Sequence, residues 1–310
     1  MSTGFPPGVA EKIKAMGAKF DNDINAATRA LYLPFVKRQS AAKVTVTADI
    51  AYGGDARQKL DLYRQEGRRL PILVYIPGGG YVGGDKNADG TFYGNLGVYF
   101  ANHGYLTIIA NYRLAPAHPW PAGAADVAGA IAWARREGES HGGDANRVFL
   151  FGQSAGATHA ASYLFDPQFH PSSGVGVIAA VLMSGGAYRV AANPPPNHVA
   201  YFGADATQYE ARSPITHVGK SKVPLLLSVA EYDPGTLTAP TFDLARAVSL
   251  RDGKAPQFAF MRGHNHVSTV QSIGSGQDDV GERVREFLAG SERFRPTDSL
   301  ACPPGPAPEQ

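Results

Sequence analysis

Short apolar runs alternate with helix-like stretches along most of the chain. Apolar segments rich in Val, Ile, Leu and Phe predict buried strands over residues 43–53, 59–63, 71–77, 105–112, 147–152, 177–185, 223–230 and 256–263. Helical periodicity predicts helices over residues 93–104, 124–137, 154–165, 241–250 and 280–290. This alternation predicts an α/β fold: a mostly parallel eight-stranded sheet with helices on both faces and its first two strands as an antiparallel edge.

Two segments interrupt this rhythm. Residues 1–42 have helical periodicity before the sheet begins, and residues 187–215 are irregular, Pro-rich and scattered with aromatic residues. We expect both to form a small cap over the carboxyl edge of the sheet, where open α/β sheets bind their ligands. Residues 43–295 then form the main domain, with 187–215 as an insertion, and the Pro-rich residues 296–310 are predicted to be a disordered tail.

Composition narrows the class of protein. The chain has 310 residues, 44% of them hydrophobic, which is enough for one large core with an appendage or two domains at most. A formal charge of +2 without a dense Lys/Arg tract argues against nucleic acid or a membrane surface as partner.

No apolar run approaches a membrane span of roughly 20 residues, and the N-terminus lacks a signal-peptide core. The single cysteine, Cys302, excludes an internal disulfide and a CxxC metal site. We expect a cytoplasmic protein.

The pattern Gly-x-Ser-x-Gly occurs twice, around Ser140 and around Ser154. A nucleophile elbow needs a strand before the serine and a helix after it, because the sharp turn projects the hydroxyl from the sheet edge. Residues 147–165 meet both conditions for Ser154. The other copy follows a helix and precedes a loop, so its glycines indicate a helix stop. We expect Ser154 to be a nucleophile and Ser140 a loop residue. The structural alternative for Ser154 is a helix N-cap.

A serine nucleophile also needs an anion-stabilising pocket. Residues 78–80 are three glycines directly after a predicted strand, and their N–H groups can turn toward one point. A phosphate-binding loop is the alternative, but no P-loop Lys-Ser/Thr follows. We therefore expect an oxyanion hole at these glycines.

The acid and the base are expected after later strands. Asp233 begins a turn beyond a strand end, whereas Glu231 is still close to the strand, so we favour Asp233. His264 and His266 both precede the final helix. The chain order Ser, Asp, His is that of α/β-hydrolases. The spacing of the two histidines indicates zinc only weakly, because no other Cys or His cluster supports it.

Taken together, these motifs resemble the hormone-sensitive-lipase-like esterases of the α/β-hydrolase superfamily. The resemblance extends to a related branch that includes bacterial feruloyl-esterase-like proteins and kynurenine formamidases. It covers roughly residues 43–290 and rests on PGGGYVGGDK, NYRLAPAHPWPAGAADV, GGDANRVFLFGQSAG, EYDPG and GHNHVS. It implies the α/β-hydrolase fold.

The resemblance also implies roles for single residues. Ser154 looks like the nucleophile, Asp233 like the orienting acid and His266 like the general base. His266 is preferred to His264 because HVS resembles the run that the family's histidine opens. The oxyanion hole looks like the N–H groups of Gly79, Gly80 and Ala155.

One departure concerns the residue before these glycines. The family usually has histidine there and this chain has Pro77, whose fixed φ should stiffen the loop. Four residues are expected to bind substrate: Tyr81, Gln153, Phe35 and Tyr201.

The implied activity is a carboxylesterase that needs no cofactor or metal. It would cleave small to medium acyl esters through an acyl-enzyme, as a monomer or a homodimer. The first alternative is an amide, formamide or carbamate hydrolase with the same site. A second is a non-catalytic relative that binds a ligand in the same cavity.

Overall fold

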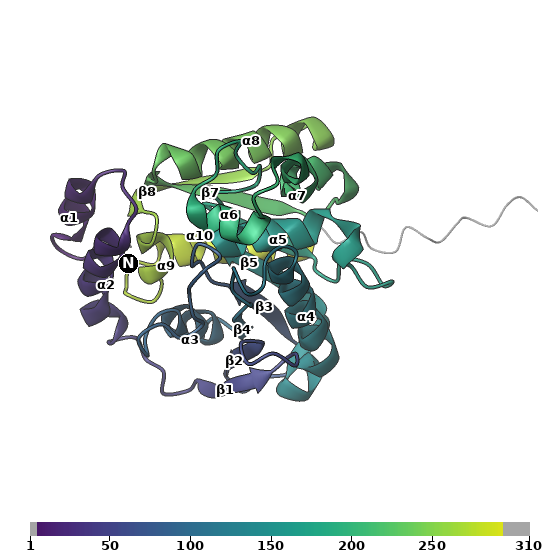
Figure 1. Ribbon diagram of the computed structural model, residues 1–310. Helices are drawn as coiled ribbons and strands as arrows, with labels where there is room; N and C mark the ends of the chain where they lie inside the picture. The colour runs from purple at the N-terminus through teal and green to yellow at the C-terminus, as the bar shows by residue number, and fades with distance from the viewer. Residues whose placement is uncertain (1–4, 294–310) are drawn as a thin grey trace, which may run out of the picture.

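The computed structural model describes residues 5–293, and in this part of the chain eight strands form one sheet (Figure 1). The strands are β1 (Thr45–Ala51), β2 (Lys59–Arg64), β3 (Leu70–Ile76), β4 (Leu106–Ala110), β5 (Gly143–Gln153), β6 (Ala179–Met183), β7 (Leu225–Tyr232) and β8 (Gln257–Asn265). Their order in the sheet is β1-β2-β4-β3-β5-β6-β7-β8. β2 pairs antiparallel with both β1 and β4, and all other pairs are parallel. The predicted topology, with its antiparallel edge, is confirmed.

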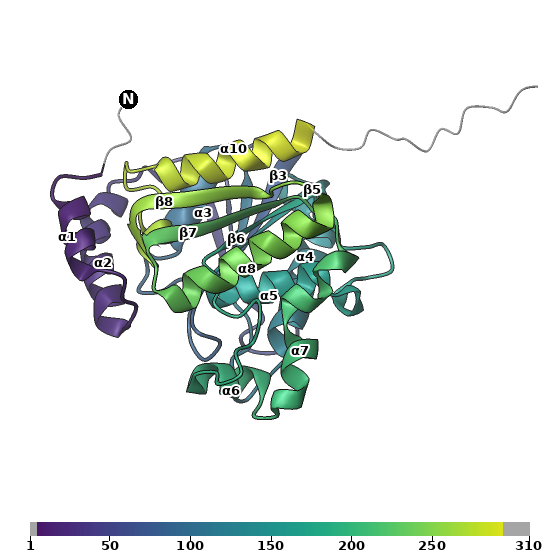
Figure 2. The ribbon, with the colours of Figure 1, turned by 90° about the horizontal axis from the view of Figure 1, so that it is seen from above.

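Helices cover both faces of this sheet (Figure 2). The α-helices of residues 5–293 are α1 (Val9–Met16), α2 (Asn22–Val36), α3 (Gly94–Asn102), α4 (Ala122–Glu137), α5 (Ala155–Phe165), α6 (Pro196–Phe202), α7 (Tyr209–Arg212), α8 (Gly235–Asp252), α9 (Ser268–Gln271) and α10 (Asp279–Arg293). α4, α5 and α8 pack on one face, and α3, α9 and α10 pack on the other. None of the helices between residues 5 and 293 has the length and apolarity to cross a membrane.

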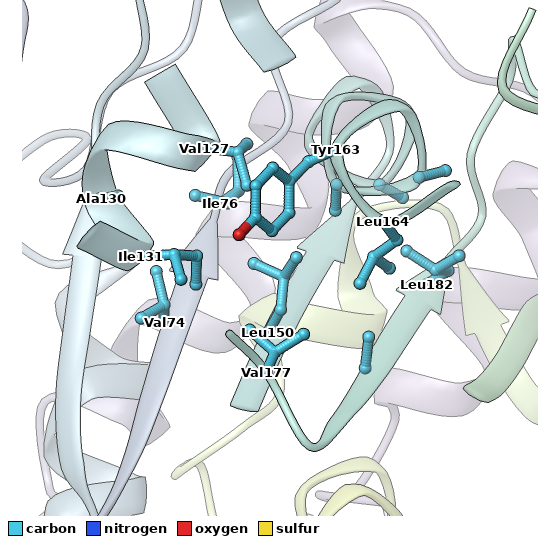
Figure 3. Close-up of a cluster of buried hydrophobic side chains, with 14 of the residues drawn as sticks. Val74, Ile76, Val127, Ala130, Ile131, Leu150, Tyr163, Leu164, Val177 and Leu182 are labelled. Atoms are coloured by element: carbon cyan, nitrogen blue, oxygen red, sulfur yellow. The ribbon is translucent and has the colours of Figure 1, made fainter. Parts of the chain in front are cut away.

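Alternation along the buried strands divides the core into two layers. In β3, Ile72, Val74 and Ile76 face the α4–α5–α8 layer, whereas Leu73 and Tyr75 face the α3–α10 layer. Figure 3 shows the first layer, where β-strand side chains such as Val74 and Leu150 meet residues of α4 and α5. β3 is buried on both faces and is therefore apolar along its length, as its continuous apolar run in the sequence indicated.

The parallel strands bring distant segments to one edge of the sheet. β3, β5, β7 and β8 all end there, so the loops that follow them lie near one another. α1 and α2 lie beside this edge, next to the end of β8 and α9 (Figures 1 and 2). The tail expected over residues 296–310 lies outside the described residues.

Candidate active site

Ser154 occupies the sharp turn between β5 and α5. Its backbone has φ 56° and ψ −126°, a conformation that non-glycine residues rarely adopt. A Cβ on Gly152 would lie 2.5 Å from the carbonyl oxygen of Gly156, and a Cβ on Gly156 would lie 2.1 Å from that of Ile76. The two glycines therefore let the turn pack against itself and against the end of β3, which is the physical basis of the sequence pattern.

His266 and Asp233 form a buried pair beside this turn. His266 Nδ1 lies 2.8 Å from Asp233 Oδ1, and both side chains are almost fully buried. Because a carboxylate only accepts hydrogen bonds, Nδ1 donates and a neutral ring keeps its lone pair on Nε2. The other carboxylate oxygen accepts from Ser184 Oγ at 2.6 Å and from the Ala230 N–H at 2.7 Å. Asp233 is thus fixed by three donors.

Gln153 and Phe20 hold His266 from two sides. Gln153 Nε2 donates to the His266 carbonyl oxygen at 3.0 Å and lies 3.4 Å from His266 Nε2. The Phe20 ring lies 4.4 Å from the imidazole, centroid to centroid. Ser154 and His266 line the same cavity, although the hydrogen bonds found among the described residues do not include one between their side chains. Such catalytic hydrogen bonds often tighten only when substrate binds.

Hydrogen bonds to its carbonyl oxygens hold the glycine loop after β3 in place. Gly79 and Gly80 have φ values of 148° and 60°, in the region that favours glycine. The Gly79 carbonyl accepts from the Gly83 N–H at 2.9 Å, and the Gly80 carbonyl accepts from Asn197 Nδ2 at 3.1 Å. In a trans peptide the C=O and N–H point in opposite directions, so anchoring the Gly79 carbonyl also fixes the Gly80 N–H. The Ala155 N–H is in the first turn of α5, where helix N–H groups lack intrahelical partners.

A cavity of about 410 Å³ lies in front of these groups. It is lined by Phe20, Asn22, Asn25, Arg29, Gly78, Gly79, Gly80, Val82, Gly83, Gly84, Asp85, Ala88, Tyr93, Gln153, Ser154, His266 and Val267. The charges on its wall are balanced: Arg29 Nη1 lies 3.0 Å from Asp89 Oδ2, and Asp85 Oδ2 lies 3.9 Å from Arg57 Nη1. The cavity therefore has no strong preference for a charged ligand.

Comparison with known proteins points to one fold and one group of relatives. The family model BD-FAE matches residues 60–164. Esterase LipQ of Mycobacterium tuberculosis is 28% identical over 281 residues, covering 83% of this chain and 64% of LipQ. Esterase LipC of the same organism is 36% identical over 126 residues, covering 39% of this chain and 30% of LipC.

Solved structures share the whole architecture. A hyperthermophilic esterase from the archaeon Pyrobaculum calidifontis superposes with a TM-score of 0.69 at 22% identity, covering 93% of this chain and 99% of that one. An esterase from the bacterial hormone-sensitive lipase family gives a TM-score of 0.67 at 19% identity, covering 93% and 99%. The chain has the α/β-hydrolase fold, and its sequence is similar to curated esterases. The fold predicted from the motifs is confirmed, and the predicted resemblance to esterases agrees with these relatives.

The chain spans only part of the length of its curated relatives, 64% of LipQ and 30% of LipC. The likeness to solved structures at about 20% identity concerns the fold. We therefore infer the substrate and the activity of this chain from the residues at the cavity.

The structure places the four expected substrate-binding residues differently. Gln153 lies on the cavity wall, but the other three do not. Tyr81 is 2% exposed, donates to Thr158 Oγ1 at 3.1 Å and stacks on Tyr201 at 5.0 Å. Its φ of 70° turns the side chain away from the cavity and into the layer behind the glycine loop. Phe35 lines a different hollow, beside Arg38. Tyr81, Tyr201 and Phe35 are therefore not among the residues that line this cavity, and their contact with substrate stays a prediction.

The two expected cap segments also have different positions. Residues 187–215 lie behind the glycine loop: Asn197 binds the Gly80 carbonyl, and Tyr201 supports Tyr81. The N-terminal segment supplies cavity wall instead, through Phe20, Asn22, Asn25 and Arg29. In the sequence, residues 22, 25 and 29 are spaced by three and four positions, which places them on one polar face of a helix. A polar face usually contacts solvent, so its role was missed.

The alternative candidates for nucleophile, acid and base form hydrogen bonds with other groups. Ser140 lies in a 3-10 turn after α4 and donates to the Glu137 carbonyl at 2.7 Å. Glu231 is exposed and accepts from the Gly263 N–H at 2.7 Å. His264 is fully buried, with Nδ1 3.0 Å from Ser268 Oγ and Nε2 3.1 Å from Asp279 Oδ2. These three residues are not among those that line the cavity.

A metal site does not emerge from this arrangement. Within residues 5–293, no three His, Cys, Asp or Glu side chains gather as metal ligands would.

Proposed function

We propose that this α/β-hydrolase is a serine carboxylesterase that acts through an acyl-enzyme, with Ser154, His266 and Asp233 as its triad. The observation that carries the proposal is the buried His266–Asp233 pair, 2.8 Å apart, beside a serine held at a strained strand-to-helix turn. Each element serves one chemical need: a nucleophile, a base, and an acid that orients the base.

In the proposed reaction, His266 Nε2 accepts the Ser154 hydroxyl proton as the oxygen attacks the ester carbonyl. Asp233 then stabilises the imidazolium through Nδ1. The protonated Nε2 transfers its proton to the departing alkoxide, and the alcohol leaves. Water, deprotonated by the same nitrogen, attacks the acyl-enzyme, and the acid leaves as Ser154 is reprotonated.

The negative oxygen of each tetrahedral intermediate would be bound by the N–H groups of Gly79, Gly80 and Ala155. The fixed orientation of the Gly80 N–H supports this role, because a preorganised donor requires no rearrangement during the reaction. The glycine loop and the elbow are in close contact, because a Cβ on Gly156 would lie 2.6 Å from the carbonyl oxygen of Pro77.

The substrates we propose are small to medium acyl esters, and the cavity of about 410 Å³ supports this size. Volumes of this order hold a ligand the size of a small ester. The N-terminal segment would act as the cap that closes one side. Cytoplasmic location stays a prediction.

Substrate turnover by paired serine variants tests the proposal. Ser154→Ala should abolish hydrolysis of p-nitrophenyl acetate while keeping the native circular dichroism spectrum, and Ser140→Ala should keep full activity. A fluorophosphonate probe should label the wild type but not Ser154→Ala. Full turnover by folded Ser154→Ala would refute the triad, and an unlabelled wild type would favour a non-catalytic ligand-binding protein.

The same site on an amide is the alternative chemistry. It requires His266 to protonate a poorer leaving group. Matched acetyl esters, N-formyl compounds and anilides, with Ser154→Ala as the blank, decide between them. Faster turnover of the amides per mole of enzyme would replace the esterase assignment.

The chain would assemble as a homodimer through the free edge of β8. An edge strand exposes unpaired N–H and C=O groups, and one edge can pair with its own copy about a two-fold axis. Phe258 and Phe260 on β8 are 36% and 56% exposed, and Phe242 of α8 stacks on Phe258. Light scattering should give twice the chain mass for the wild type and a monomer for Phe260→Asp. A monomeric wild type would refute it.

A further inference from the structure

One face of α2 is bonded to the loop that carries His266. Asn25, Thr28 and Tyr32 are spaced by three and four residues, so they share a side of the helix. Each bonds to a different residue of segment 265–277, which contains the end of β8, α9 and the turn after it. The two segments are more than 230 residues apart in sequence.

Thr28 makes the contact nearest to His266. Its side chain is fully buried, and its Oγ1 accepts from Asn265 Nδ2 at 2.9 Å while donating to the Ile24 carbonyl at 2.7 Å. Asn265 directly precedes His266, and its own Oδ1 accepts from the Ser268 N–H at 3.0 Å. The Asn265 side chain therefore joins α2 to the turn in which His266 sits.

Tyr32 and Asn25 hold the rest of the same segment. The Tyr32 hydroxyl donates to Gln277 Oε1 at 2.8 Å, and Gln277 Nε2 lies 3.0 Å from His264 Nε2. Gln271 Nε2 donates to Asn25 Oδ1 at 3.1 Å. His264, rejected as the base, thereby becomes part of a buried network that connects α2 with the end of β8.

We propose that Thr28 is a positioning residue for His266, with Tyr32 and Asn25 as its supports. The inference rests on the proposed function, because it assigns these side chains to the alignment of the general base. Thr28 contacts neither substrate nor the imidazole; it acts through Asn265. A base on a loop loses rate steeply when its position shifts, since a misplacement of about 1 Å can cost roughly 100-fold.

Thr28→Val tests the proposal, because it keeps the shape of the side chain and removes the hydroxyl. We expect kcat for p-nitrophenyl acetate to fall by roughly 10- to 100-fold. KM should stay within about twofold of the wild type, since the substrate is bound by other groups. Thr28→Ser, which restores the acceptor, should recover most of kcat.

Tyr163→Phe is the matched control. It also removes a buried hydroxyl, one that donates to the Val175 carbonyl in the α5 layer, away from the cavity. It should change the unfolding midpoint without changing kcat. If Thr28→Val does not fold, Tyr32→Phe replaces it under the same criteria, with an expected smaller fall in kcat.

The outcomes separate this inference from the proposed function. A wild type without Ser154-dependent turnover would refute the esterase proposal. An active wild type whose kcat is unchanged by Thr28→Val, or falls equally in Tyr163→Phe, would refute the positioning role. Failure of Thr28→Ser to recover kcat would refute it as well.

Discussion

Gly156 packs its α-carbon against the carbonyl oxygen of Ile76, so that even one added methyl carbon would approach the oxygen to 2.1 Å. The obstacle is backbone, which cannot rotate away as a side chain can. Gly156→Ala should therefore displace the elbow from the end of β3. We expect a loss of about 1–3 kcal/mol in the free energy of unfolding, measured by urea denaturation, together with loss of esterase turnover.

The control for this substitution is Gly290→Ala. Gly290 lies in α10 with nothing within 4 Å of an added Cβ. Alanine there should raise stability by about 0.5–1 kcal/mol, because it reduces the entropy of the unfolded chain. Equal stability changes in the two variants would contradict the packing argument.

Asp233→Asn should lower kcat by roughly 10⁴-fold, because an amide favours the wrong imidazole tautomer and does not stabilise the imidazolium. Glu231→Gln is the matched control: Glu231 is an exposed acid two residues earlier, on the Gly263 N–H. Its activity should stay near the wild-type value. Steady-state kinetics on p-nitrophenyl acetate measures both, and a larger loss in Glu231→Gln would reassign the acid.

Asn197→Leu should make the glycine loop of the oxyanion hole less rigid. The side chain donates to the Gly80 carbonyl at 3.1 Å and contributes nothing to the cavity wall. Loss of a direct oxyanion donor costs about 100- to 1,000-fold in kcat, so loss of this support should cost less. A fall in kcat with unchanged KM is expected. A changed KM with constant kcat would instead place residue 197 in substrate binding.

Lys86 is expected to be a stability determinant beside the cavity. Its Nζ lies 2.8 Å from both Asp49 and Asp61, and Asp61 is buried. Burial lowers the pKa of Lys86, but the hydrogen bonds and charges of the two carboxylates outweigh it and the pKa is raised. The stabilisation is therefore complete below the ordinary lysine pKa and is lost as the pH rises through the raised value.

Lys86→Met leaves the Asp61 carboxylate buried without its cation. The free energy of unfolding should fall by roughly 3–5 kcal/mol, measured by urea denaturation at neutral pH. Adding Asp61→Asn to this variant should recover part of the loss, because the buried charge is then removed. A double variant less stable than Lys86→Met alone would contradict this explanation.

Local sequence patterns sufficed for the sheet and the elbow. Ser154 could be separated from Ser140 because the preceding strand and the following helix are adjacent in sequence. Asp233 was selected by its place in a turn beyond a strand end, whereas the choice of His266 over His264 needed the resemblance of HVS to a family motif, since both histidines follow the same strand. The pocket walls could not be predicted in this way. Tyr81 is turned inward by a positive φ, and Phe20 reaches His266 only through packing between residues 246 positions apart.

The contacts of α2 with segment 265–277 also set an order of events during synthesis. The helix emerges from the ribosome more than 230 residues before the residues that bond to it. Until segment 265–277 is made, Thr28 lacks its bond to Asn265 and Tyr32 lacks its bond to Gln277, and closing so long a loop is a slow, non-local step. A nascent chain that already contains Ser154 would therefore stay inactive, and hydrolysis would begin only when α2 and segment 265–277 meet.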